Sequence, residues 1–360
     1  MIEPGNPGPA WTQVDQEIAA AARALEQGAL VGFPTETVYG LGADAENPAA
    51  VAAIYAAKGR PQDHPVIVHL APGAVLDYWA CDIPVEARQL AAAFWPGPLT
   101  MILTRAAHIP AAVSGGQDTV GLRCPSHPVA IALLQAFKGG DGGIAAPSAN
   151  KFGNVSPTTA EHVRDEFRLE AGAGGAIAMV LDGGASEVGI ESTIVDLSRL
   201  ASHGPVLLRP GHISAEAIAA VIGQLPAAPD AAAPRASGTL ASHYAPHTPV
   251  AMQDSATLPS TLGQLHLAGQ KVALIHYSDV AARAAHADHA HATARLPASA
   301  DGFAHALYAS LRAMDTSGAD LILVEAPPCD DAWIGVNDRL RRAVHGSSGI
   351  LHGLLNQQLP

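Results

Sequence analysis

The stretch that decides the fold runs from Gly28 to Gly42 and reads Gly-Ala-Leu-Val-Gly-Phe-Pro-Thr-Glu-Thr-Val-Tyr-Gly-Leu-Gly. Its apolar residues 30–33 predict a strand, and the Pro-Thr-Glu-Thr sequence that follows predicts a turn. An Ala-rich helix is then predicted from Asn47 to about Ala57, and Lys58-Gly-Arg60-Pro61 follows its end. This order places hydroxyls and backbone amides beside two cations, which suits a phosphate and a small polar ligand.

The composition limits the classes of function. The chain has 360 residues, of which 48% are hydrophobic and 4% aromatic. Its net charge of −13, from 20 Lys and Arg against 33 Asp and Glu, argues against a tight, nonspecific nucleic-acid binder. The three cysteines lie far apart, so neither a disulfide framework nor a zinc site is expected. With no signal peptide and no apolar run long enough to span a bilayer, we expect a cytoplasmic protein without membrane contact.

Strands and helices are predicted along the whole chain, with the strands in excess. The predicted strands include Thr119–Arg123 and Val206–Arg209 and, beyond residue 247, Val272–Tyr277 and Leu321–Glu325. This excess, and the short links between some neighbouring strands, predict an α/β protein with a mixed sheet. A Pro/Ala-rich segment from Pro226 to Pro234 is typical of a linker. We therefore predict a catalytic domain over residues 13–223, a linker over 224–247 and a small three-layer α/β domain over 248–356.

Three segments carry candidate ligand chemistry, and the first two also have an ordinary structural explanation. Lys58 and Arg60 could hold phosphates, although cations are also favourable at any helix C-terminus. Ser148 and Asn150, in the segment Ala146–Gly153, supply oriented donors in a loop that could equally be a turn before a capped helix. The glycine-rich segment 182–193 lacks the Lys of a phosphate-binding loop and is not followed by a helix.

One glycine pattern is rejected as a nucleotide site. Gly40-Leu-Gly42-Ala-Asp-Ala45 fits a loose dinucleotide fingerprint. The predicted strand ends before Pro34, however, and a turn separates it from the glycines, which the fingerprint does not allow.

These segments, together with Trp95–Thr100, Val120–Pro125 and Leu208–Gly211, resemble the threonylcarbamoyl-AMP synthase family, of the TsaC/YrdC type. The resemblance covers about residues 15–222, and the linker and C-terminal region are similar to the long form of the family. It implies an N-terminal YrdC-like twisted open sheet with a concave cavity, followed by a smaller Rossmann-like α/β domain.

The resemblance also implies a reaction. L-threonine, bicarbonate and ATP, with Mg²⁺, give threonylcarbamoyl-AMP and pyrophosphate, so the chain is expected to be a nucleotidyltransferase. A separate tRNA threonylcarbamoyl-transferase complex then uses the product to modify an adenosine beside the anticodon. No metal ligands among the protein's own residues are implied.

The site residues implied by the resemblance fall into three overlapping sets. The catalytic set is Lys58, Arg60, Ser148 and Asn150. L-threonine contacts fall on Thr35, His69, Arg123 and Ser192, and ATP contacts on Arg60, His64, Thr119, Ser148, Ser156, Arg209 and Tyr244. Two positions depart from the family pattern: His64 stands where Asn is usual, and Ser237-Gly238-Thr239 replaces the common Ser-Pro-Gly-Met.

Two other functions remain as alternatives. An RNA-binding module of the same fold would lack synthase activity, and the net charge weighs against it. An enzyme that makes a carbamoyl-adenylate from carbamoyl phosphate would need additional zinc-finger and acylphosphatase-like segments, which neither the cysteine spacing nor the length permits.

Overall fold

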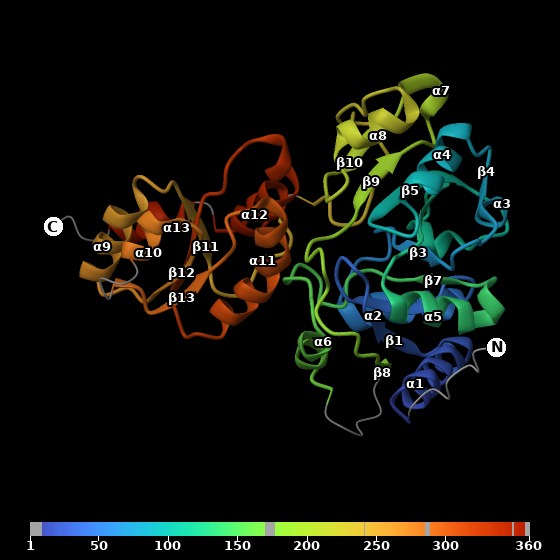
Figure 1. Ribbon diagram of the computed structural model, residues 1–360, viewed down its shortest axis with the longest axis horizontal. Helices are drawn as coiled ribbons and strands as arrows, with labels where there is room; N and C mark the ends of the chain where they lie inside the picture. Colours follow the sequence, from blue (N-terminus) through green and yellow to red (C-terminus); the bar gives the residue numbers. More distant parts are fainter. Residues whose placement is uncertain (1–8, 170–176, 241, 285–288, 348, 357–360) are drawn as a thin grey trace, which may run out of the picture.

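The computed structural model describes residues 9–169, 177–240, 242–284, 289–347 and 349–356. Two α/β units lie side by side, the N-terminal one in blue to yellow and the C-terminal one in orange to red (Figure 1). The N-terminal strands are β1 (Leu30–Phe33), β2 (Gly40–Asp44), β3 (Ile67–Leu70), β4 (Ala80–Cys81), β5 (Leu99–Arg105), β6 (Thr119–Arg123), β7 (Gly143–Ala145), β8 (Ile177–Val180), β9 (Thr193–Asp196) and β10 (Val206–Arg209). The helices are α1 (Pro9–Glu26), α2 (Pro48–Lys58), α3 (Leu76–Trp79), α4 (Val85–Phe94), α5 (Pro128–Ala136), α6 (Ala160–Phe167), α7 (Leu200–His203) and α8 (Ala215–Ile222).

All ten strands of the N-terminal unit form one mixed sheet. Its order is β10-β9-β5-β6-β3-β7-β2-β1-β8, and β4 pairs with β5 at the side. The pairs β3–β6, β5–β9 and β1–β8 are parallel, whereas the other pairs are antiparallel. The predicted mixed α/β sheet is therefore confirmed.

Strand β2 was not predicted, because its sequence Gly-Leu-Gly-Ala-Asp has little of the β-branched content typical of strands. Packing explains its glycines. A Cβ on Gly42 would lie 2.8 Å from a methyl of Ile144 and 2.9 Å from the ring of Phe33. Gly42 thus lets neighbouring side chains close over the middle of the sheet.

The C-terminal unit is a three-layer α/β domain. Its strands β11 (Val250–Gln253), β12 (Val272–His276), β13 (Ala292–Arg295) and β14 (Leu321–Glu325) form a parallel sheet in the order β11-β14-β12-β13. Helices α9 (Leu258–Leu267), α10 (Asp279–Ala284) and α13 (Ile350–Asn356) lie on the outer face. Helices α11 (Ala300–Asp315) and α12 (Ile334–His345) lie on the other face, toward the N-terminal unit (Figure 1). The expected Rossmann-like architecture is confirmed.

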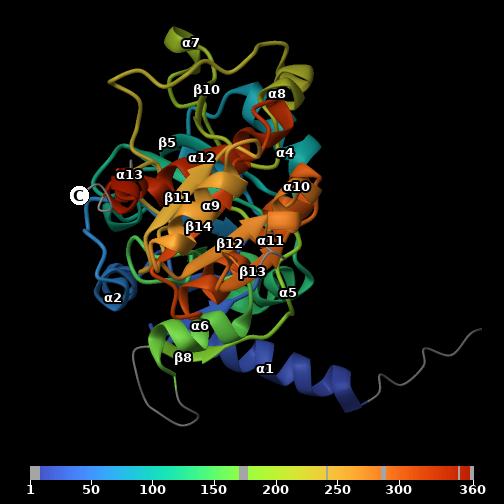
Figure 2. The same ribbon diagram turned by 90° about the vertical axis from the view of Figure 1, so that its left-hand side faces the viewer.

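The two units are in close contact. Figure 2 looks from the C-terminal side and shows its sheet and helices in front of the large sheet. A Cβ on Gly189, before strand β9, would lie 2.5 Å from the backbone of Ala304 and His305 in α11. The contact is therefore too tight for any side chain at residue 189. In the described part of the chain, no helix is long and apolar enough to cross a membrane.

Candidate active site

The predicted site residues gather around one cavity in the N-terminal unit, at the face that the linker covers. Its empty volume, which includes space open to solvent, is about 490 Å³. The walls include eight predicted residues: Thr35, Arg60, His69, Arg123, Ser148, Ser192, Arg209 and Tyr244. The structure thus brings together all four predicted threonine contacts and four of the predicted ATP contacts.

Strand pairing positions two of the residues that line the cavity. His69 and Arg123 are directly paired residues at the ends of the parallel strands β3 and β6, so their side chains lie next to each other. Both are almost fully buried. Burial and the nearby Arg123 lower the pKa of His69 to about 3. His69 is therefore neutral across the physiological range, and none of the described residues forms a hydrogen bond with its Nδ1.

Glu36 holds Arg123 in place. One of its carboxylate oxygens lies 2.7 Å from an η nitrogen of Arg123, and the other accepts a hydrogen bond of 3.1 Å from the backbone N–H of Ser126. The Nε of Arg123 donates to the carbonyl of Gly97 at 3.3 Å. With these partners the guanidinium lies at the cavity wall in one orientation, as a carboxylate receptor requires.

Hydroxyl groups complete this end of the cavity. The Thr35 hydroxyl donates to the carbonyl of Val38 at 2.6 Å, which closes the turn between β1 and β2. The Ser192 hydroxyl shares a hydrogen bond of 2.8 Å with that of Thr100 on β5. Both hydroxyls belong to buried residues whose backbones are fixed by the sheet and the turn.

Lys58 lies at the end of α2 and is only 3% exposed. Gly59, with φ +64°, ends the helix in the left-handed conformation and turns the chain back toward Arg60. The Lys58 ammonium donates to the carbonyl of Ser148 at 2.6 Å and also to that of Asn150. Burial and the nearby Arg60 hold the pKa of Lys58 well below its ordinary value.

Arg60 and Arg209 both line the cavity, and both contact Ser237 of the linker. Arg60 donates to the carbonyl of Pro65 at 2.7 Å and to the hydroxyl of Ser237 at 3.2 Å, and its Nε has no partner among the residues that the structure describes. Arg209 donates to the carbonyls of Ser192 at 2.9 Å and Ser237 at 2.8 Å. Burial lowers the pKa of both guanidinium groups.

In the described part of the chain, no carboxylate forms an ion pair with Lys58, Arg60 or Arg209. All three side chains are buried, and their acceptors are neutral carbonyls and a hydroxyl. A buried charge that forms no ion pair is costly, even though the Glu191 carboxylate favours the charged form of Arg209. The cluster is therefore suited to an anionic ligand, which would supply the missing negative charge.

The remaining predicted residues are not among those that line the cavity. Lys58 is one of them, and its ammonium contacts the wall through the carbonyl of Ser148. Asn150 lies behind the wall, where it donates to the carbonyls of Lys151 and Asn154. Ser156 donates to Glu191 at 2.5 Å. His64 lines a neighbouring pocket with Arg60, on the outer side of the linker. Thr119 begins β6 and is not among the residues that line the cavity.

Several residues of the site were not predicted. Ser237 was noted only as a departure from the family pattern, although it contacts two of the buried arginines. Glu36 lies inside the quoted Pro-Thr-Glu-Thr motif and could have been singled out. Glu191 lines the cavity and forms an ion pair of 2.8 Å with Arg339 of the C-terminal unit. No local signal in the sequence links these two residues, which are 148 positions apart.

The carboxylates near the cavity do not form a Mg²⁺ site. Glu36 is paired with Arg123, and both oxygens of Glu191 already accept hydrogen bonds. Among the described residues, no group of three or more His, Cys, Asp and Glu could hold a metal ion. These residues do not fit a protein-held ion, whereas Mg²⁺ commonly enters such sites on a substrate's phosphates.

Two family models match the chain. The first, described as "Telomere recombination", matches residues 23–211, and the second, described as "Threonylcarbamoyl-AMP synthase, C-terminal domain", matches residues 213–344. The threonylcarbamoyl-AMP synthase of Pyrococcus abyssi is 38% identical over 340 residues, which cover 91% of this chain and 94% of that protein. The chain belongs to the threonylcarbamoyl-AMP synthase family. A further threonylcarbamoyl-AMP synthase, from Bacillus subtilis, is 38% identical over 92% of this chain and 94% of its own length.

Solved structures agree with this membership. The crystal structure of P. abyssi Sua5 complexed with L-threonine matches with a TM-score of 0.81 and 37% identity, over 92% of this chain and 94% of that one. The match extends across both α/β units, because either unit alone is shorter than the aligned length. This chain therefore shares both α/β units with P. abyssi Sua5.

Proposed function

We propose that the chain is an L-threonylcarbamoyladenylate synthase, which forms threonylcarbamoyl-AMP and pyrophosphate from L-threonine, bicarbonate and ATP. The observation that carries the proposal is the buried cluster of Lys58, Arg60 and Arg209, whose acceptors are all neutral. A triphosphate supplies several negative charges to such a cluster. Arg123, at the other end of the same cavity, is suited to the carboxylate of an amino acid.

The reaction balances in two steps. The threonine ammonium and bicarbonate give a carbamate, one water and one proton, with a new bond between the amine nitrogen and carbon. A carbamate oxygen then attacks the α-phosphorus of ATP, and the bond to the β-phosphate oxygen breaks to release pyrophosphate. No group of the protein needs to form a covalent intermediate.

The protein's contribution is placement and charge. Arg123 and His69 hold threonine at the strand ends, so that the amine lies in the cavity between the two sets of ligands. Lys58, Arg60 and Arg209 offset the charge that grows on the phosphates as pyrophosphate leaves. Mg²⁺, when bound to the ATP phosphates, supplies further positive charge there. The product is expected to pass to a tRNA threonylcarbamoyl-transferase complex.

The test is pyrophosphate release by the purified protein, with L-threonine and bicarbonate each omitted in turn. Release that requires both, and that falls when L-serine replaces L-threonine, supports the synthase and its choice of amino acid. ATP turnover that ignores both, or no turnover, would refute the proposal. RNA binding with a steep salt dependence would then support the alternative of an RNA-binding module.

A further inference from the structure

Glu191 is an acidic residue in the wall of a cavity that we propose for anionic ligands. It lies just before Ser192 and is largely buried. One carboxylate oxygen accepts a hydrogen bond of 2.5 Å from the Ser156 hydroxyl. The other accepts from the Tyr308 hydroxyl at 3.0 Å and from Nε of Arg339 at 2.8 Å. Three groups from different parts of the chain therefore hold one carboxylate.

The charge of Glu191 does not disappear by protonation. Burial alone would raise its pKa, but Arg339, Arg209 and the Ser156 hydroxyl together lower the pKa of Glu191 to about 2. Glu191 is therefore an anion at every pH at which the protein works. Without compensation, this anion would repel a triphosphate across the same cavity, because charges interact strongly where water is excluded.

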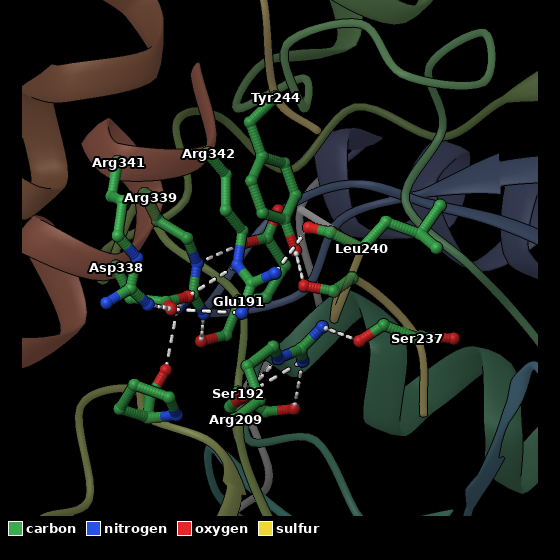
Figure 3. Close-up of polar contacts among 12 residues, drawn as sticks. Glu191, Ser192, Arg209, Ser237, Leu240, Tyr244, Asp338, Arg339, Arg341 and Arg342 are labelled. Carbon is green, nitrogen blue, oxygen red and sulfur yellow. Dashed lines mark hydrogen bonds and ion pairs between the residues drawn. The ribbon is translucent and has the colours of Figure 1, made fainter. Parts of the chain in front are cut away.

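Compensation comes from the C-terminal unit. Arg339 on α12 is completely buried and donates to the Glu191 side chain, to the Glu191 carbonyl at 3.0 Å and to the Pro210 carbonyl at 2.7 Å. Figure 3 shows Arg339 beside Glu191, with Tyr244 of the linker close by. Glu191, whose carbonyl Arg339 contacts, directly precedes Ser192, and Pro210 directly follows Arg209.

The neighbouring carboxylate of Asp338 does not neutralise Arg339 by itself. Its neighbour Asp338 lies 3.1 Å away, but Asp338 also pairs with Arg341 and Arg342 (Figure 3). The set of two carboxylates and three arginines therefore has one positive charge in excess. Because Arg342 also donates to the Leu240 carbonyl, α12 contacts both the cavity wall and the linker.

We propose that Arg339 is a positioning residue of the active site, which neutralises Glu191 and thereby keeps the nucleotide end of the cavity net positive. The inference rests on the proposed function, since it assumes that the cavity binds ATP. It gives the C-terminal unit a specific chemical task, which is to complete the charge balance of a site whose substrate contacts all lie in the N-terminal unit and the linker.

The experiment measures binding of a non-hydrolysable ATP analogue with Mg²⁺ by calorimetry, and L-threonine binding separately. In the Arg339→Met variant Glu191 keeps its charge but loses its partner, so we expect the analogue to bind at least about tenfold more weakly. L-threonine, which carries no net charge, should bind within about threefold of wild type. Arg341→Met is the matched control, because Arg341 lies on the same helix with a side chain 71% exposed, and it should bind the analogue as wild type does.

The double variant Glu191→Gln/Arg339→Met separates charge from geometry. It contains neither charge, so analogue binding should return to within about threefold of wild type, since neutral replacements of a buried ion pair are often tolerated. Arg339→Met with wild-type binding, or a double variant no better than the single one, would overturn the inference. If thermal melting shows that Arg339→Met is unfolded, the double variant decides alone, and weak analogue binding by a folded double variant refutes the inference. A wild-type protein that does not bind the analogue contradicts the proposed function instead.

Discussion

Replacing Arg123 with Met should separate its contribution to stability from its proposed role in threonine binding. Arg123 and Glu36 form an ion pair of 2.7 Å in which each side chain is 4% exposed. Removing the guanidinium leaves a buried carboxylate without its partner, which costs about 3 to 5 kcal/mol. For a unit of this size, that cost lowers the melting temperature by on the order of 10 °C.

Threonine affinity should fall for a different reason. Two charge-assisted hydrogen bonds to the amino acid carboxylate contribute about 3 kcal/mol together, which corresponds to on the order of a hundredfold in KM. The double variant Glu36→Gln/Arg123→Met has no unpaired charge, so its melting temperature should recover most of the loss. Its KM for L-threonine should stay as high as that of the single variant, because the carboxylate receptor is still missing.

The assays are thermal melting and pyrophosphate release at varied L-threonine. Arg88→Met is the control, because the Arg88–Asp77 pair has nearly the same length, 2.8 Å, but its side chains are 49% and 64% exposed. It should change stability by less than about 1 kcal/mol. Equal melting temperatures for the single and double variants would contradict the stability argument. A double variant with wild-type KM would contradict the assignment of Arg123 to the carboxylate.

Three further predictions concern other residues of the site. Lys58→Met should reduce the rate of pyrophosphate release by about 10² to 10³. Its melting temperature should be unchanged or higher, because the substitution removes a buried cation that forms no ion pair with a described carboxylate, and a lower melting temperature would contradict this description of Lys58. The pKa of His69 is depressed to about 3, so below pH 6.5 the unfolded chain binds a proton that the folded chain does not. Urea unfolding should therefore show that wild type loses more stability than His69→Gln between pH 7 and pH 5, and equal losses would refute a neutral, buried His69. Gly238→Ala places a methyl group 2.0 Å from the Tyr244 hydroxyl, at a residue whose φ is +72°, so the linker turn should move away from the cavity. Limited proteolysis should then cut residues 224–247 faster than in wild type, and equal rates would contradict this packing.

Much of the fold could be predicted from local patterns. Strands with a strong apolar pattern, such as Thr119–Arg123, Val206–Arg209 and Leu321–Glu325, have the predicted bounds. The strands that were missed in the C-terminal unit, β11 and β13, lie at the edges of its sheet. Edge strands are less buried, so their sequences carry a weaker apolar signal.

The residues of the candidate site also differ in how well the sequence predicts them. Residues that adjoin strands and turns, such as Thr35, His69 and Arg123, come together because strand pairing fixes their register. The ion pair between Glu191 and Arg339 depends on how two units pack, and nothing in either local segment encodes that distance. The linker residue Ser237 was also underrated, because its role depends on which arginines lie beneath it.

The position of Arg339 in the second of the two units has a consequence for biosynthesis. A ribosome releases the N-terminal unit first, and that unit can begin to fold while the remaining residues are still being made. The wall of the cavity is complete only when residue 339 has left the ribosome and α12 has docked. A nascent chain in which α12 has not yet docked therefore has the buried cations but an uncompensated Glu191, and we expect full nucleotide binding only after α12 has docked.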